Sequence, residues 1–324
     1  LQERIADAEQ SETHNAAQES RMAELREWMA KLEVNQQYSD EQVRMAVERI
    51  TVVDAETIRI RFRYPGAELE KETNRMELYI TGDTHGDFSH FRPESFYEQE
   101  RLTKEDVILI AGGFGGVWYG DSRDDAGLNF LDSRPFTTAF VSGNHENYDA
   151  LAAYPQAEWH GGRVRTIRPS VLMLERGQVF DLGGRMFFAM GGASSHDIQD
   201  GILEPDAPDF LRRFQQLNAQ GAAFRVNHRS WWREELPNEA EYAEARANLD
   251  RAGWTVDYIL THCGPTSIQN DLLGPLSKPD ALTDFLEEIG QRCRFKYHFF
   301  GHYHGNKIIR KKYVLLYEQI IRLK

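Results

Sequence analysis

Six short apolar runs recur along residues 76–304, and each one breaks into glycine, aspartate, asparagine or histidine. They read MELYITGD, DVILIAGG, TTAFVSGN, RMFFAMGG, VDYILTHC and KYHFFGHYH. Runs of this length, rich in β-branched and aromatic residues, predict buried strands. Helical patterns alternate with several of them, at about 121–132, 146–153, 207–220, 238–252 and 279–290. This alternation predicts an α/β architecture, in which functional residues lie just beyond the strand ends.

Residues 1–75 have a different character and predict a separate domain, which precedes a second domain at 76–324. The segment is rich in Glu, Ala, Gln and Arg, and it contains no glycine before Gly66. Apolar residues at helical spacing predict a long helix or a helix pair, followed by a second helix at about 41–50. The stretch TIRIRFRY alternates strictly and predicts a half-buried strand. We expect the helices to allow self-association.

Residues 1–75 resemble the C-terminal tail of large serine recombinases, where a helical region leads into a short strand of the kind ITVVDAETIRIRFRY. The segment has no catalytic serine, so the resemblance implies an interaction or scaffold appendage and no recombinase activity. Contact with DNA is the alternative. It is weakened by the excess of acidic over basic residues in the segment.

Charge and hydropathy narrow the expected surroundings of the chain. The net charge of −13 gives no overall attraction to nucleic acid or to an anionic membrane, although a local basic groove stays compatible with it. No apolar run is long enough for a transmembrane helix, and LQERIADAEQ is too polar for a signal peptide. Cys263 and Cys293 give no disulfide framework and are expected to be small buried side chains. These features predict a cytoplasmic protein.

Five segments present metal-ligand residue types directly after apolar strands. They are GDTHGD (Asp83, His85), GGFGG (Gly113), GNHE (Asn144, His145), THCGP (His262) and GHYHG (His302, His304). Alternate side chains of an extended segment point to the same side, so the Asp-x-His and His-x-His pairs can each reach one metal cluster. Imidazole and carboxylate together suit divalent Mn, Fe, Zn or Ni.

In this order, the motifs resemble those of the calcineurin-like metallophosphoesterases over nearly all of residues 76–324. The family pattern is Asp-x-His, Gly-Asp, Gly-Asn-His-Asp/Glu, His and Gly-His-x-His. The resemblance implies a four-layer α/β/β/α sandwich with two metal ions at its centre. It also implies hydrolysis of phosphoric esters by a metal-activated hydroxide, as a phosphatase or a phosphodiesterase. Phosphomonoesters, cyclic nucleotides, nucleic acids and phosphoproteins all remain open as substrates.

The resemblance also implies a role for each matching residue. Asp83, His85 and His304 would hold one metal ion, with Mn favoured and Fe, Zn or Ni as alternatives. Asn144, His262 and His302 would hold the other. His145 would face the substrate phosphate as proton donor or electrostatic stabiliser, and Glu146 would orient His145.

Gly113 departs from the family pattern, because the aspartate of the Gly-Asp motif bridges both metals. Glycine has no side chain with which to ligate, so reduced metal occupancy and impaired catalysis are expected. Three explanations are open: a deliberately inactivated variant, a natural variant, or compensation by Asp87, Asp121, Asp124 or Asp125. The alternative function is a non-catalytic phosphate-ligand binding or regulatory protein that retains a partial metal site.

Several less specific features surround these motifs. Phe114, Trp118 and Tyr119 either line a pocket or pack in the core. The stretch 196–238 predicts an insertion on the rim of the site, and GGASSHD resembles a loop near the site of bacterial relatives, which makes His196 and Asp197 candidate rim residues. In HRSWW, Arg229 and its two aromatic neighbours either grip a phosphate or stack a base, or Trp231 and Trp232 are simple core or lid residues. The basic run KIIRKKY either attracts a polyanion or protects a hairpin edge.

Overall fold

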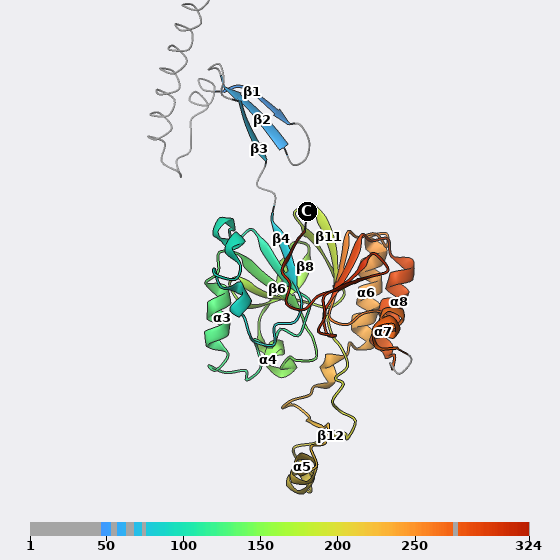
Figure 1. Cartoon of the computed structure of the whole chain (residues 1–324). Helices are drawn as coiled ribbons and strands as arrows, with labels where there is room; N and C mark the ends of the chain where they lie inside the picture. The colour runs from blue at the N-terminus through green and yellow to red at the C-terminus, as the bar shows by residue number, and fades with distance from the viewer. Residues whose placement is uncertain (1–46, 53–56, 63–67, 73–75, 275–277, 324) are drawn as a thin grey trace, which may run out of the picture. The chain divides into compact units, whose positions relative to one another are not determined.

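The computed structural model describes residues 47–52, 57–62, 68–72, 76–274 and 278–323. The chain divides into two compact units, Leu1–Arg75 and Met76–Lys324, and each is described by itself (Figure 1). None of the described helices has the length and apolarity needed to cross a bilayer.

The first unit contains an antiparallel sheet of three strands in sequential order: β1 (Val47–Val52), β2 (Thr57–Phe62) and β3 (Glu68–Glu72). Strand β2 confirms the strand predicted from TIRIRFRY. The helix predicted at 41–50 is wrong over 47–50, which belong to β1. There, β-branched residues favour a strand, and Ile50 pairs with Ile60 of β2. The other predicted helices and the recombinase-like helical region lie outside the described residues.

The second unit is built on two sheets. The seven-stranded sheet has the order β18-β4-β5-β6-β9-β8-β7, and the six-stranded sheet has the order β10-β11-β14-β15-β17-β16. The strands of the first are β4 (Leu78–Thr81), β5 (Val107–Ile110), β6 (Thr137–Val141), β7 (Gln156–Trp159), β8 (Gly162–Arg168), β9 (Val171–Leu174) and β18 (Ile321–Leu323). Those of the second are β10 (Gln178–Leu182), β11 (Arg185–Met190), β14 (Tyr258–Thr261), β15 (Tyr297–Phe300), β16 (Lys307–Ile309) and β17 (Tyr313–Leu315).

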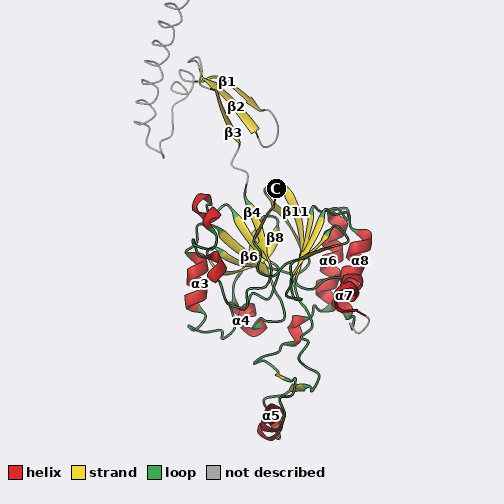
Figure 2. Cartoon of the chain, in the orientation of Figure 1, coloured by secondary structure: helices red, strands yellow, loops and turns green. Residues whose placement is uncertain are grey.

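Helices cover the outer face of each sheet (Figure 2). They are α3 (Asp125–Asp132), α4 (Tyr148–Ala153), α6 (Glu239–Arg251), α7 (Thr266–Leu273) and α8 (Ala281–Arg292), with short 3-10 turns at η1 (Ser89–Phe91), η2 (Tyr97–Arg101) and η3 (Arg233–Glu235). Leu128 of α3 and Leu151 of α4 pack with Phe140 of β6. Leu249 of α6 and Leu286 of α8 pack in the cluster on the other sheet.

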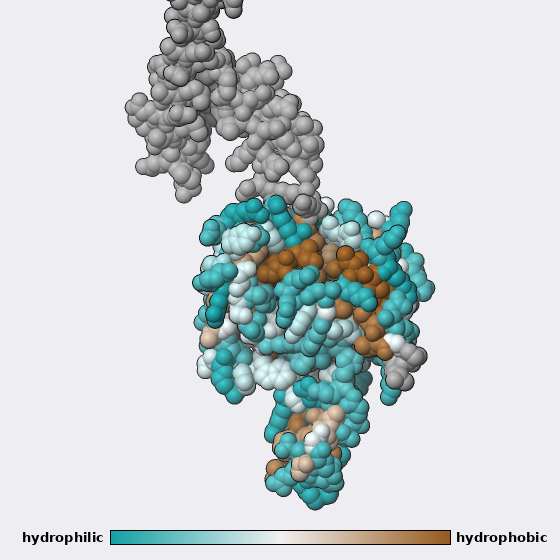
Figure 3. All heavy atoms as spheres, viewed as in Figure 1, coloured by the Kyte–Doolittle hydropathy of each residue, from teal (hydrophilic) through white to brown (hydrophobic). Residues whose placement is uncertain are grey.

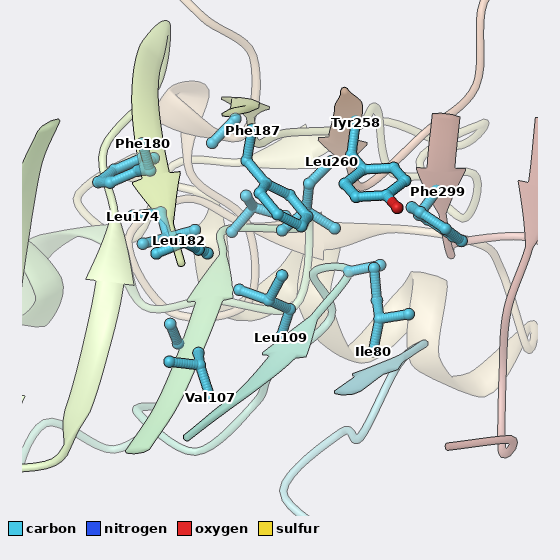
Figure 4. Close-up of a cluster of buried hydrophobic side chains, with 14 of the residues drawn as sticks. Ile80, Val107, Leu109, Leu174, Phe180, Leu182, Phe187, Tyr258, Leu260 and Phe299 are labelled. Atoms are coloured by element: carbon cyan, nitrogen blue, oxygen red, sulfur yellow. The ribbon is translucent and has the colours of Figure 1, made fainter. Parts of the chain in front are cut away.

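The main core lies between the two sheets (Figure 4). Ile80, Val107 and Leu109 from one sheet pack in one cluster with Phe187 and Leu260 from the other. The central strands are buried along their whole length, because one face meets the opposite sheet and the other meets helices. The layers therefore follow the α/β/β/α order that the sequence predicts.

An insertion between β11 and α6 extends away from the sheets (Figure 1). It contains a short parallel pair, β12 (Ile202–Leu203) and β13 (Arg225–Val226), and the helix α5 (Phe210–Ala219). No residue of α5 is buried. Leu211 and Phe214 are exposed on it, and Figure 3 shows apolar surface on this projection.

Candidate metal centre

Polar side chains gather where the parallel strands of both sheets end. Asp83 and His85 follow β4, while Gly113 follows β5. The other predicted residues follow β6, β14 and β15: Asn144, His145, His262, His302 and His304. The loops after β4 and β5 are tied together, because the backbone N–H groups of Thr84 and His85 both donate to the carbonyl of Gly113, at 3.1 and 2.8 Å.

Asp83, His85 and His304 converge on one point. Their potential ligand atoms all lie within 4.8 Å of one another. His85 Nε2 and His304 Nε2 lie 3.4 and 3.5 Å from Asp83 Oδ2, longer than normal N–H···O hydrogen bonds. Asp83 is 5% exposed, and its Oδ2 accepts no hydrogen bond from the described residues. A buried carboxylate oxygen that faces two imidazoles in this way fits a cation.

The charge state of Asp83 agrees with this role. Burial alone would raise the pKa of its carboxyl group, but the nearby His262 and the contacts with His304 and His85 hold the pKa far below its usual value. The backbone N–H of His302 also donates to Asp83 Oδ1, at 2.9 Å. Asp83 is therefore ionised at neutral pH and carries the negative charge that a divalent cation needs.

A second pair of metal-ligand atoms faces each other beside the first group. His262 Nδ1 lies 2.8 Å from the carbonyl oxygen of Ala111, which accepts its proton, so Nε2 is the nitrogen with a free lone pair. That Nε2 lies 3.0 Å from Asn144 Oδ1, a second acceptor. Burial lowers the pKa of His262. Two acceptors each about 2.1 Å from one cation at a right angle are about 3.0 Å apart, so this pair also fits a metal ion.

His302 completes this second group. Its ring centroid lies 5.0 Å from that of His262. His85, His302 and His304 all adopt left-handed backbone conformations, with φ of 47°, 68° and 46°. Such conformations are uncommon outside glycine and concentrate at functional sites. The predicted residues of both groups are thus brought together at the strand ends.

His145 lies next to the first group. Its ring centroid is 4.8 Å from that of His85. Burial, together with the neighbouring His85, lowers the pKa of His145 to about 4. The imidazole of His145 is therefore neutral at physiological pH in the metal-free protein.

The family resemblance implies that Glu146 orients His145. In the structure, Glu146 instead binds the backbone of the loop that follows Gly113. Its buried carboxyl group accepts backbone hydrogen bonds from Phe114 at 2.8 Å, and from Gly115 and Gly143 at 3.3 Å each. Burial raises the pKa of Glu146 to about 8. The side chain turns toward its backbone partners because buried N–H groups must be satisfied.

A side chain at position 113 would point into the metal centre. The φ of Gly113 is +55°, and a Cβ built on it would lie 2.8 Å from Asp83 Oδ2. A carboxylate at this position would therefore enter the first group of ligands directly.

The four aspartates considered as substitutes all have other partners. Asp87 accepts the backbone N–H of Ser89 at 2.9 Å, and Asp124 accepts those of residues 118–120. Asp121 pairs with Arg123, and Asp125 pairs with Arg168. None of them joins the metal-ligand group found among the described residues. The structure gives no support to compensation by these carboxylates.

The insertion supplies the rim of the centre. His196 lies against His302, with ring centroids 4.5 Å apart. Asp197 forms an ion pair with Arg225, at 2.5 Å. The charge of Arg225 also contributes to the lowered pKa of His145, after burial and His85. Sequence reasoning missed Arg225, since a single arginine in an insertion carries no motif.

Other features of the insertion have structural partners. Arg229 lies over the ring of Phe210 in α5, at 5.6 Å, rather than beside the metal-ligand residues. Trp232 is buried, and Trp231 Nε1 donates to Glu235 at 2.8 Å. Glu235 in turn accepts from the Ser195 hydroxyl at 2.7 Å. The basic run KIIRKKY forms the edge hairpin of β16 and β17, where Arg310 pairs with Asp271.

A pocket of about 410 Å³ opens beside the centre. His85 and His145 line one side of it, and Trp118 and Tyr119 line another. Phe114 does not line it; the ring is buried and stacks on Phe140 with centroids 3.9 Å apart. Of the three aromatic residues after Gly113, two therefore line a pocket and one packs in the core.

Comparison with known proteins agrees with this arrangement. A family model described as calcineurin-like phosphoesterase matches residues 76–306. No curated protein matches the chain. The matched region begins where the second unit begins, and it contains every residue of the two groups described above.

Proposed function

Since the chain belongs to the calcineurin-like phosphoesterase family, we propose that it is a metal-dependent hydrolase of phosphoric esters whose activity is impaired by glycine at position 113. The observation that carries this proposal is the convergence of Asp83, His85 and His304 around a buried carboxylate oxygen that accepts no hydrogen bond from the described residues. A purely structural aspartate would be expected to accept hydrogen bonds with both oxygens.

Two groups of residues would hold divalent ions, with Mn²⁺ as the expected metal. Asp83, His85 and His304 form one group; Asn144, His262 and His302 form the other. When bound, such ions polarise phosphate oxygens and lower the pKa of water. The imidazole, carboxylate and amide donors described above suit this class of cation.

The chain's own residues would bind and orient the phosphate. His145 is neutral in the metal-free protein, so it can offer an N–H to a phosphate oxygen. An anionic phosphate beside His145 would raise the pKa of the imidazole, which would let the ring carry a proton to the leaving oxygen. Arg225 adds positive charge on the same side of the centre, and Asp197 holds its guanidinium in place.

Glycine at position 113 removes one metal ligand and leaves the surrounding loop in place. Glu146 binds the backbone of the loop after Gly113 and does not depend on a side chain at position 113. Loss of a partner that only supports a ligand costs about 10–100-fold in metal affinity or activity, so loss of a direct ligand should cost more.

Binding without turnover is the second candidate function, and Gly113 is the observation that favours it. A protein with a weakened metal centre can still bind a phosphate ligand through its remaining histidines and Arg225. This candidate predicts no hydrolysis even when an aspartate is restored at position 113.

A paired measurement separates the two candidates. The chain, Gly113→Asp and the uncharged control Gly113→Asn are loaded with Mn²⁺, and metal per chain and hydrolysis of an aryl phosphomonoester and an aryl phosphodiester are measured. We expect Gly113→Asp alone to raise the metal content toward two ions and to turn on hydrolysis. If all three proteins stay inert, the hydrolase proposal is overturned.

A further inference from the structure

The pocket beside the metal centre has the size and position of a substrate site. We call it the Trp118 pocket, and it is lined by His85, Gly86, Phe88, Gly115, Gly116, Trp118, Tyr119, Arg123, Asp124, Gly127 and His145. Its volume of about 410 Å³ lies within the range of small-molecule pockets and is too small for a folded partner. Because His85 and His145 form part of its wall, a molecule in this pocket would reach the centre directly.

Hydrogen bonds fix the backbone of the loop that carries Trp118 and Tyr119. The Asp124 carboxylate accepts the backbone N–H groups of Trp118 at 3.2 Å, Tyr119 at 3.1 Å and Gly120 at 2.8 Å. Asn147 Nδ2 donates to the carbonyl of Trp118 at 2.9 Å. The backbone that carries Trp118 and Tyr119 is therefore held in place without help from a ligand, which lowers the entropy cost of ordering the loop on binding.

The side chains on this wall are aromatic rings and charged groups that already have partners. Tyr119 is 53% exposed, an unusual position for a large ring. Arg123 lies 4.0 Å from the centroid of the Tyr119 ring, and it is already paired with Asp121 at 2.7 Å. Asp124 is likewise engaged by the backbone. A planar aromatic group would gain contact with these rings, whereas a second charged group would find its partners occupied.

Glycines form part of the pocket wall next to the centre. A Cβ at Gly115 would lie 2.7 Å from the backbone carbon of His85, and a Cβ at Gly116 would lie 2.5 Å from the Phe114 ring. Side chains at these positions could not be added without moving the wall. Glycine at these two positions therefore lets the wall pass close to the His85 backbone and to the Phe114 ring.

We propose that the Trp118 pocket binds the aromatic part of a phosphoric ester whose phosphate lies on the metal centre. The substrate class is an aryl phosphate or a nucleoside phosphate, which share a planar ring joined to a phosphate. This inference rests on the proposed function, because the metal centre is what would hold the phosphate.

Binding to the Mn²⁺-loaded chain tests the inference without requiring turnover. Calorimetry would compare phenyl phosphate, adenosine 5′-monophosphate, propyl phosphate and inorganic phosphate. Stacking on an aromatic side chain is worth about 5–100-fold in affinity, so at least one aromatic ester should bind about tenfold or more tightly than propyl phosphate. Comparing phenyl phosphate with adenosine 5′-monophosphate distinguishes an aryl phosphate from a nucleoside phosphate as the preferred substrate class.

Substitutions in the Trp118 pocket test whether its aromatic side chains cause the preference for aromatic esters. Tyr119→Ala and Trp118→Leu should each reduce the affinity for the preferred aromatic ester about fivefold or more and leave inorganic phosphate unchanged. Tyr97→Ala is the matched control, since Tyr97 is 70% exposed and lies outside the pocket. Tyr119 is too exposed for its truncation to prevent folding, so the test does not depend on the Trp118 variant.

Two outcomes would overturn the inference in different ways. If inorganic phosphate binds but propyl and aromatic esters bind equally, or if Tyr119→Ala has no effect, the pocket inference fails alone. If no phosphate compound binds to the Mn²⁺-loaded chain, the proposed phosphate site fails and the pocket inference fails with it.

Discussion

Replacing Gly113 with aspartate should lower stability without metal, and bound metal should recover much of that loss. The backbone at Gly113 has φ of +55°, a region that aspartate tolerates better than most residues. The new Cβ would lie 2.8 Å from Asp83 Oδ2 and 3.0 Å from its Cγ. Contacts this short require Asp83 to shift, and the added carboxylate is directed at a carboxylate that is already ionised, so a cation or a proton would relieve the repulsion.

The cost in the metal-free protein follows from this geometry. Two carboxylates about 4 Å apart repel by about 4 kcal/mol at an effective dielectric constant of 20. Proton uptake relieves part of this, and the left-handed backbone adds about 1 kcal/mol. A net loss of about 2–5 kcal/mol lowers the Tm of a domain of this size by about 4–20 °C, at about 2–4 °C for each kcal/mol.

Bound metal ions should offset much of this loss in stability. A gain of about 100-fold in Mn²⁺ affinity adds about 2.7 kcal/mol of stability at saturating metal. The rise in Tm caused by Mn²⁺ should therefore be larger in Gly113→Asp than in the unchanged chain by about 5–10 °C.

Calorimetric melting of four proteins in a chelator and in Mn²⁺ provides the test. Gly113→Ala carries the added Cβ and its backbone cost, and Gly113→Asn adds the shape of the side chain without its charge. Only Gly113→Asp should combine the lowest Tm in chelator with the largest rise in Mn²⁺. If it behaves like Gly113→Ala in both conditions, the carboxylate does not enter the centre and the reasoning is refuted.

Three further predictions concern other residues. Burial lowers the pKa of His298 to about 3, so the unfolded chain binds its proton first and stability is lost as pH falls below about 6.5, by about 1.4 kcal/mol for each unit. In urea unfolding, the free energy of unfolding of His298→Gln should therefore fall by about 2 kcal/mol less than that of the unchanged chain between pH 7 and pH 5. His228→Gln is the control for this measurement, because the hydrogen bond that the exposed His228 donates to Asp149 raises the pKa of His228 and gives the opposite sign. Glu146→Ala should destabilise the protein by about 2 kcal/mol or more in chemical denaturation, because it leaves buried N–H groups without an acceptor, whereas Glu146→Gln keeps the oxygen that accepts from two of them and should cost less. Asp83→Asn should abolish the rise in Tm caused by Mn²⁺, and a rise equal to that of the unchanged chain would place the metal elsewhere.

The strands that carry the site were predictable, and several that complete the sheets were not. The runs before Asp83, Asn144 and His302 are short, apolar and closed by turn residues, so local sequence identifies them. Strand β7 is mostly exposed and polar, and it forms only through its antiparallel pairing with β8. A strand that depends on a long-range partner leaves little local pattern.

The ligand residues could be predicted for the same reason, since motif spacing places them on strand ends. The role of Glu146 could not, because its main acceptor contact is with Phe114, 32 residues away in the sequence. The position of Arg225 likewise depends on a contact within the insertion, with Asp197 as its partner 28 residues away. Contacts of this kind depend on tertiary packing that no local pattern encodes.

The supports of the loop after β5 explain how one ligand can be lost while all the others stay in place. Glu146 holds the loop at Phe114, and Asp124 holds it at Trp118 and beyond, so its shape does not require a side chain at position 113. Glycine suits a left-handed backbone and removes a carboxylate that would face Asp83 whenever the metal is absent. Residues that serve function at the expense of stability are common in active sites, and replacing one often stabilises the metal-free fold. Gly113 is therefore expected to weaken the metal centre while making the metal-free protein more stable.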